Sequence, residues 1–158
     1  MNKKLLYVLI IIAIVAIVGV GIYFLTRNNK TAELDLQQLN TAFTEKSPFN
    51  EMATMDVTAE ELNMLLEVNP DDVQGVIGKI PMMNVHASMY LVIEAKDGAV
   101  DTIKEKVDSY ASAQEMQWQM YLPEQYDLVK QRKTGVVGNY VYLIIADTAA
   151  ELESLIIK

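Results

Sequence analysis

The chain has 158 residues, no cysteine and one histidine, and its 21 acidic residues outnumber 13 Lys and Arg. All 21 acids but only nine of the cations follow Lys30, so the part after Lys30 carries a formal charge of −12. This charge argues against nucleic acid as a partner, because a phosphate backbone would be repelled. The lack of cysteine excludes disulfides, thiolate chemistry and a lipid-modified cysteine.

The first predicted element is the uncharged run from Leu5 to Leu25, LLYVLIIIAIVAIVGVGIYFL. As a helix rising about 1.5 Å per residue, this run would span about 31 Å, close to the ~30 Å hydrocarbon core of a bilayer. Tyr7 and Tyr23 suit the two membrane interfaces. The sequence therefore predicts a transmembrane helix over 5–25, with the lipid bilayer as its partner.

Positive charges on either side of this run set the expected orientation. Lys3, Lys4 and the terminal amine precede it, whereas Arg27 and Lys30 follow it. This bias of about one charge predicts a cytoplasmic N-terminus and a C-terminal domain outside the cell membrane.

The predicted organisation is a cytoplasmic N-terminus at 1–4, a signal-anchor helix at 5–25, a linker at 26–32 and an extracytoplasmic domain at 33–158. The alternative is a cleaved signal peptide followed by secretion, because a basic start and an apolar run are typical of one. Signal peptides usually turn polar after about 7 to 15 apolar residues, whereas this run continues to Leu25.

Short helices are expected at the start of the domain. Apolar residues at helical spacing predict a helix over 32–43, and Pro48 starts a short helical turn after it. Thr58 and Glu61 form a capping box, which predicts a helix over 59–67.

Two strands and a long helix follow. The first strand is predicted over 73–80 and the second over 85–95, with a turn at 81–84 between them. Apolar and mixed residues alternate in the second strand, so one face is expected in the core and the other half wet. Helical spacing of apolar residues then predicts a long amphipathic helix over 99–120 that covers the sheet.

A second hairpin is predicted after a further turn of helix at 124–129. Its strands cover 130–137 and 140–146, around Gly138 and Asn139, a pair that suits a type II′ turn. The second of these strands is apolar on both faces, which places it in the sheet interior.

Asp147 or Thr148 is expected to cap a last helix. The predicted fold class is therefore α+β, preceded by one N-terminal transmembrane helix. Its largely antiparallel sheet has about four strands in two hairpins, with the long helix between them and short flanking helices.

Two motifs carry a resemblance to a known family. The segment 121–126, YLPEQY, followed by an apolar and basic strand and then GNYV at 138–141, resembles the bacterial family called domain of unknown function 4358. LVIEA at 91–95 is similar to the same pattern. The likeness covers about 33–154.

The resemblance implies a small secreted or membrane-attached envelope domain, mainly from Gram-positive-type bacteria, and it supplies no catalytic or binding residue. Many members begin with a lipobox cysteine, which this chain lacks. The apolar helix is therefore left as the expected anchor.

His86 is the strongest candidate for chemistry, because it is the only histidine and shares a predicted strand face with Ser88 and Glu94. A catalytic triad is disfavoured, since His86 and Ser88 would lie about 6.6 Å apart along the strand and no nucleophile elbow follows. No zinc ligand set, calcium loop or phosphate-binding glycine loop is found, so no metal or cofactor is expected.

Lys130, Arg132 and Lys133 form the one basic cluster of the domain, with Tyr126 beside them. As a solvated edge strand, this cluster would guard against aggregation. As a binding surface, it would contact an anionic lipid or a glycopolymer.

Amphipathic aromatic residues are frequent after the anchor. Most are expected to pack between the long helix and the sheet with a hydroxyl at the surface. The alternative is a shallow ligand or peptide groove lined by some of them. They are Tyr90, Tyr110, Trp118, Tyr121, Tyr126, Tyr140 and Tyr142.

The leading hypothesis is a non-enzymatic binding or accessory module of the bacterial cell envelope, with an envelope protein or glycopolymer as partner. The alternative is a small-ligand-binding or enzymatic domain with its site around His86, Glu94 and the tyrosines. A structural spacer would require the absence of any exposed apolar patch. The candidate binding surface consists of His86, Glu94, Tyr126, Lys130, Arg132 and Lys133.

Overall fold

The computed structural model describes residues 33–157, which belong to one compact unit, Glu33–Lys158. The predicted N-terminus at 1–4, the transmembrane helix at 5–25 and the linker at 26–32 lie outside the described residues. Within residues 33–157, no helix is both long enough and apolar enough to cross a membrane. The described residues form an α+β domain with five α-helices and a five-stranded antiparallel sheet.

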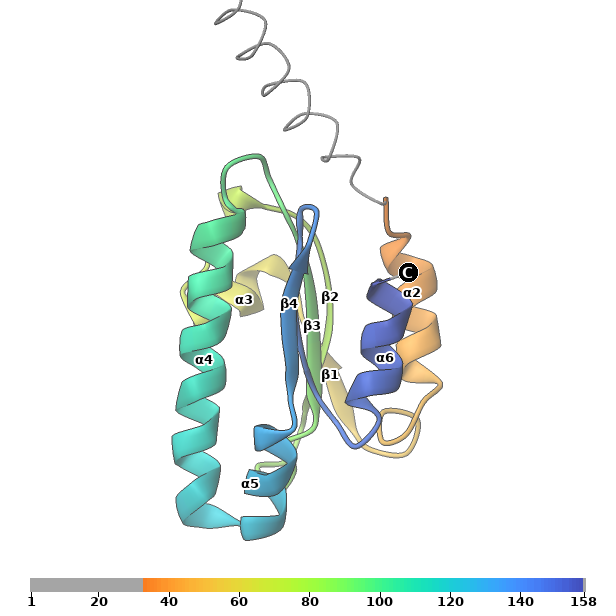
Figure 1. Cartoon of the computed structure of the whole chain (residues 1–158), viewed down its shortest axis with the longest axis vertical. Coiled ribbons are helices and arrows are strands. Elements are labelled where there is room, and N and C mark those ends of the chain that lie inside the picture. The colour runs from red at the N-terminus through yellow and green to blue at the C-terminus, as the bar shows by residue number, and fades with distance from the viewer. Residues whose placement is uncertain (1–32, 158) are drawn as a thin grey trace, which may run out of the picture. The chain divides into compact units, whose positions relative to one another are not determined.

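The strands lie in the order β1-β2-β3-β5-β4 (Figure 1). Antiparallel pairing of β2 with β3 and of β4 with β5 confirms both predicted hairpins. A further strand, β1, adds to the edge of β2, where Met55 pairs with Ile80. The strands are β1 (Thr54–Asp56), β2 (Val73–Pro81), β3 (Met89–Ala95), β4 (Lys133–Val137) and β5 (Tyr140–Ile145).

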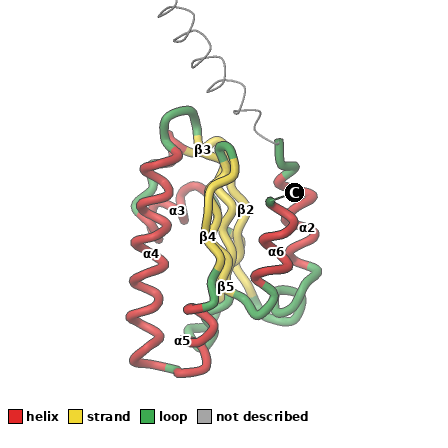
Figure 2. The backbone as a smooth tube through the Cα atoms, viewed as in Figure 1, coloured by secondary structure: helices red, strands yellow, loops and turns green. Residues whose placement is uncertain are grey.

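Helices cover both faces of the sheet, so the domain has three layers (Figure 1). Figure 2 shows the strands between a layer that contains α4 and a layer that contains α2 and α6. A short 3-10 turn, Pro70–Asp72, precedes β2. The helices of one face are α2 (Leu36–Thr44) and α6 (Ala149–Ile156), and those of the other are α3 (Ala59–Leu66), α4 (Val100–Tyr121) and α5 (Pro123–Lys130).

Each layer has its own apolar core. On the α4 side, Ile103, Val107 and Ala111 follow one another at four-residue steps and are buried against the sheet. On the α2 and α6 side, Phe43 and Leu152 are buried against the opposite sheet face. Both faces of the central strands are therefore dry.

For this reason, the prediction that one face of the second strand is half-exposed to water is wrong. Tyr90 and Val92 of β3 are 0% exposed, because α2 and α6 cover them. The strand also starts later than predicted. Its partner β5 ends with Ile145 opposite Met89, so residues 85–88 have no strand to pair with and form a loop.

Local sequence signals are confirmed at two places. The capping box forms, because the Thr58 side chain accepts from the Glu61 amide while the Glu61 side chain accepts from the Thr58 amide. At the second hairpin, Gly138 has a φ of 58°, as the first central residue of a type II′ turn requires.

Two element boundaries differ from prediction, and one predicted cap makes no side-chain hydrogen bond. The first helix starts at Leu36, because Asp35 is its N-cap and accepts from the Gln38 amide at 3.0 Å. β4 starts at Lys133 because α5 continues through Lys130. Thr148 is the N-cap of α6, but its side chain makes no capping bond.

Candidate functional site

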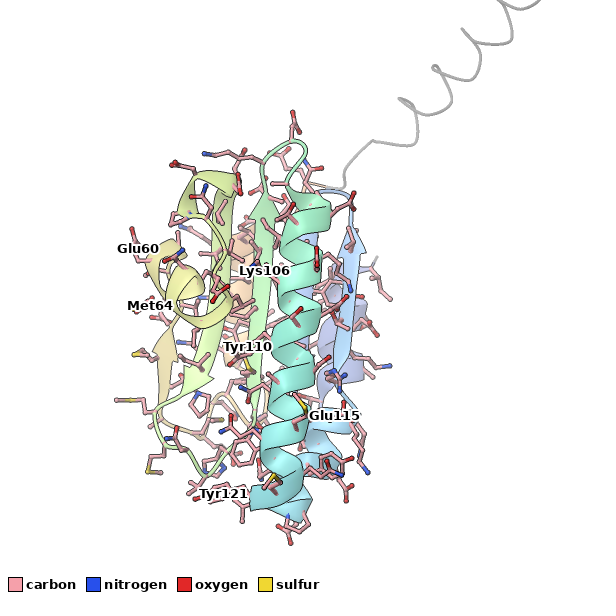
Figure 3. All side chains as sticks on the ribbon, turned by 90° about the vertical axis from the view of Figure 1, so that its left-hand side faces the viewer. Glu60, Met64, Lys106, Tyr110, Glu115 and Tyr121 are labelled. Carbon is pink, nitrogen blue, oxygen red and sulfur yellow. The ribbon has the colours of Figure 1, made fainter. Side chains whose placement is uncertain are left out.

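A groove lies between α4, the end of β2 and the loop before β3, with a volume of about 240 Å³. In Figure 3, α3 lies beside the upper half of α4, and below α3, on the same side of α4, no helix covers the sheet. We call this hollow the α3–α4 groove. It is lined by Leu65, Ile80, Pro81, Asn84, His86, Ala87, Met89, Tyr110, Gln114, Gln117 and Trp118.

One wall of the groove is a stripe along α4. Tyr110, Gln114 and Gln117 follow at steps of four and three residues, which places them on one face of the helix. Tyr121 continues this stripe four residues later and is 57% exposed. Trp118 lies beside the stripe, where its indole N–H donates to the Gln114 side-chain oxygen at 3.0 Å.

Tyr110 brings a polar tip to this wall. Burial raises the pKa of its hydroxyl, so the hydroxyl stays protonated at neutral pH. Within residues 33–157, the Tyr110 hydroxyl forms no hydrogen bond with another residue. It is also not a buried unsatisfied polar atom, so it reaches the surface of the groove. The Tyr110 hydroxyl is therefore available to a bound group.

The floor and the outer edge of the groove are apolar. Ile80 belongs to the floor, and Met55 is its cross-strand partner, so both side chains lie on the same face of the sheet. Met55 is 45% exposed at the sheet edge. Leu65 of α3 closes the upper end, and the preceding Met64 is 75% exposed.

Methionine is unusually exposed in this domain. Of the eight methionines within residues 33–157, only Met52 and Met89 are half-buried or buried. Methionine is flexible and polarisable, and it is over-used at surfaces that bind protein partners. We call the exposed set the methionine surface: Met55, Met64, Met82, Met83, Met116 and Met120.

Most Lys and Arg side chains of the domain form internal ion pairs. Within residues 33–157, seven of the eight Lys and Arg lie in ion pairs, and the exception is Lys96. Near the groove, Lys106 lies 3.2 Å from Glu67. The domain as a whole is acidic, because the part after Lys30 has 21 acidic residues and only nine Lys and Arg.

His86 lies in the loop before β3 and lines two hollows. One is the α3–α4 groove. The other, of about 340 Å³, also contains Glu51, Met83 and Ser88. Within residues 33–157, no hydrogen bond joins His86 to a carboxylate or to Ser88, although Ser88 and Glu51 line the same hollow.

Glu94 lies at the other end of β3. Six strand residues from Met89 to Glu94 cover about 16 Å, so the structure does not bring Glu94 to His86. Glu94 lies opposite Tyr140 in the neighbouring strand. Burial, with a smaller contribution from the Glu94 carboxylate, raises the pKa of the Tyr140 hydroxyl, which accepts from the Leu34 amide at 3.2 Å.

The predicted basic cluster is brought together, but each cation has an acidic partner. Lys130 lies 2.8 Å from Asp127 and 4.6 Å from the centre of the Tyr126 ring. Arg132 lies 2.7 Å from Glu115, and Lys133 lies 3.7 Å from Glu153. The geometry supports the role of a solvated edge better than the role of an anion-binding surface.

The aromatic residues divide between the two layers. Tyr110 and Trp118 line the α3–α4 groove, as the groove interpretation predicted. Tyr90, Tyr140 and Tyr142 instead pack in the α2 and α6 layer, so the expectation that most lie against the long helix is wrong for these three.

A family model matches residues 47–146, under the description Domain of unknown function (DUF4358). The chain belongs to this family. The match confirms the resemblance carried by YLPEQY and GNYV. Comparisons with curated proteins and with solved structures give no match.

The DUF4358 region, residues 47–146, contains all five strands together with α3, α4 and α5. It therefore includes every residue that lines the α3–α4 groove. The YLPEQY motif forms the junction between α4 and α5, and its first residue, Tyr121, continues the groove stripe. The helices α2 and α6, which cover the opposite face, lie outside the DUF4358 region.

The groove in the DUF4358 region is lined mainly by apolar and neutral polar side chains. Within residues 33–157, no three His, Asp or Glu side chains come together as metal ligands would. The groove combines an apolar floor with the neutral polar groups of Gln114, Gln117 and Tyr110. Such an arrangement suits contact with apolar side chains of another molecule.

Proposed function

We propose that the protein is anchored in the cell membrane by residues 5–25 and uses its α+β domain, outside the membrane, to bind another protein of the bacterial cell envelope. It acts without catalysing a reaction. The uncharged run at 5–25 supports both the anchor and a place for the domain beside the membrane. The methionine surface is the observation that carries the binding role.

The energetic argument is simple. Fully burying one methionine side chain contributes about 1.5–3 kcal/mol, so covering three or four of them contributes about 5–12 kcal/mol. Association costs about 4–15 kcal/mol in lost freedom. The two ranges are comparable, so covering several of these exposed methionines supports a binding role over a spacer role.

A protein partner fits the surface better than a glycopolymer or a small molecule. The cations that would hold an anionic polymer are each paired with a carboxylate. The α3–α4 groove, at about 240 Å³, is smaller than the ~300–1,000 Å³ typical of small-molecule pockets. An enzymatic site around His86 and Glu94 is disfavoured by their separation along β3.

The binding role is tested in cells that produce the full chain. A photo-crosslinking amino acid is placed at Met64 or Met120, and matched controls carry it at the exposed Gln74 or Lys96. We expect one defined protein adduct from the methionine positions and none from the controls. Adducts of equal yield from all positions, or from none, would refute the proposal.

The anchor is tested by fractionation of the same cells. The full-length chain should sediment with membranes, and protease added outside the membrane should degrade the domain. A mature form that begins after residue 25 and stays soluble would replace the anchor with the secretion alternative.

A further inference from the structure

The helix layer on the α4 side of the sheet has a gap. The 22 residues of α4 extend about 33 Å, whereas the 8 residues of α3 extend only about 12 Å. The ion pair between Lys106 and Glu67 places the end of α3 near the first half of α4. Beside the second half, the ends of β1 and β2 have no helix above them (Figure 3).

The groove at this gap has the walls that a helix needs. The stripe of Tyr110, Gln114, Gln117 and Tyr121 forms one side, and Ile80 with Met55 forms the floor. About 17 Å of α4 remain beside the gap, which matches a helix of about 8 to 11 residues. An apolar stripe on that helix would contact the floor, as the stripe of α4 does on the neighbouring strands.

An added strand suits this edge less well than a helix. β1 has only three residues, Thr54–Asp56, so it presents a very short edge for backbone pairing. Short edge strands disfavour strand addition, whereas helix-in-groove binding needs an apolar groove with anchor positions along it.

The charge of the domain indicates which residues should flank the apolar stripe of such a helix. Glu60 lies four residues before Met64, so both lie on the same face of α3 (Figure 3). Glu60 forms no ion pair within residues 33–157, whereas Lys106 is already paired with Glu67, and the domain as a whole is strongly acidic. A second copy of this acidic chain would be repelled, and a partner rich in Lys and Arg would be attracted.

We infer that the α3–α4 groove holds a short amphipathic helix of a partner protein, with apolar residues facing Ile80 and Leu65 and with Lys and Arg on its flanks. This inference rests on the proposed function, because it names the chemistry of the partner. Met55 and Met64 at the rim adapt to the apolar stripe of that helix.

Trp118 reports directly on the occupancy of the groove, because it is the only tryptophan of the chain and lines the groove. The probe is a synthetic peptide of about 14 residues, made of Leu and Lys in an amphipathic helical pattern and labelled with an energy acceptor for tryptophan. It is titrated against the full chain in nanodiscs of zwitterionic lipid, with empty nanodiscs subtracted.

Two control peptides separate shape from charge. One replaces every Lys by Glu, and the other has the composition of the probe but a scrambled order without an apolar stripe. We expect energy transfer from Trp118 to saturate with the probe, and the two control peptides to bind at least tenfold more weakly.

Gln117→Lys and Gln119→Lys form the matched pair of variants. Both positions are exposed on α4, but Gln117 lines the groove, whereas Gln119 lies about 200° further around the helix. Q117K should weaken binding of the probe about tenfold, and Q119K, which adds the same charge, should change it less than twofold.

Equal binding of the Lys and Glu peptides, equal effects of Q117K and Q119K, or no binding of the probe would each overturn the inference. If the probe fails while the crosslinks from Met64 and Met120 persist, the protein binds a partner of other chemistry. If those crosslinks are absent as well, the proposed function fails too.

Discussion

Two buried tyrosines predict how the fold responds to alkali. Tyr90 is 0% exposed, and its hydroxyl donates to Asn40 Oδ1 at 2.6 Å. Tyr142 is 5% exposed, and its hydroxyl donates to Glu153 Oε1 at 2.8 Å. Burial is the main cause that raises the pKa of each tyrosine from 10.0 to about 12.

These shifts set both the sign and the size of the effect. Below pH 10, both tyrosines are protonated in the folded and the unfolded chain, and their contribution to stability is fully present. Between about pH 10 and 12, the unfolded chain loses protons that the folded chain keeps, so the free energy of unfolding falls as pH rises. Two pKa units correspond to about 2–3 kcal/mol per tyrosine, or about 5 kcal/mol for both.

The assay is urea unfolding of the full chain at a series of pH values from about 8 to 12. Lysines also titrate in this range, so the tyrosine contribution is read from the difference between the parent chain and its Tyr90→Phe or Tyr142→Phe variant. In each variant, the part of the fall in the free energy of unfolding that is due to these tyrosines should be about half of that in the parent chain. Tyr121→Phe, at a 57% exposed position, should leave the fall unchanged.

The reasoning would be refuted by a midpoint that falls equally in the parent and in both variants. It would also be refuted if phenolate absorbance showed that all tyrosines ionise together near pH 10. A domain stability of about 5–15 kcal/mol makes a loss of this size easy to detect.

Four further substitutions test the packing of the sheet, the cap of α3 and the exposure of one methionine. Gly78→Ala should lower the free energy of unfolding by about 1–3 kcal/mol in urea, because a Cβ there would lie 2.8 Å from the Tyr90 carbonyl oxygen. Gly75→Ala should cost less, since its Cβ meets only side-chain atoms, and the reverse order would contradict this. Thr58→Ala should cost about 0.5–2 kcal/mol in the same assay through the lost cap of α3, and a neutral result would show that the cap contributes little. Met64→Gln should change stability by less than about 0.5 kcal/mol, because this side chain is exposed, so a larger loss in thermal unfolding would place it in the core.

Elements with strong local signals could be predicted from the sequence. The helix predicted over 99–120 is observed as Val100–Tyr121, because its apolar residues repeat at helical spacing over six turns. The capping box joins Thr58 to Glu61, three residues later, and Gly138 determines only the conformation of its own turn. Both signals are local, so they can be recognised without knowing the rest of the fold.

Elements that depend on distant partners could not be predicted. β1 has no pattern of its own, and its three residues are ordered by pairing with the end of β2. Tyr90 was predicted to be half-exposed because it alternates with apolar residues and shares its strand face with Ser88 and Glu94. Its partner, Asn40, lies 50 residues away on α2, and no local signal indicates that contact.

The methionine surface was not predicted, for a related reason. The sequence marks Met116 and Met120 as apolar residues, and only the structure shows that they lie off the buried stripe of α4. The basic cluster stood out in the sequence because its acidic partners, Glu115 and Glu153, come from other elements. The available signal was the methionine count, nine in 158 residues, several of them in predicted turns or on polar helix faces.

The most direct measurement compares the oxidation of methionines in two settings. Native membranes that contain the full chain, and the purified full chain in nanodiscs, are treated with the same oxidant, and sulfoxide at each methionine is quantified by mass spectrometry. If a partner covers the methionine surface, Met55 and Met64 should oxidise several-fold more slowly in native membranes, while the half-buried Met52 behaves alike in both. Equal rates at all six exposed methionines would contradict the binding role.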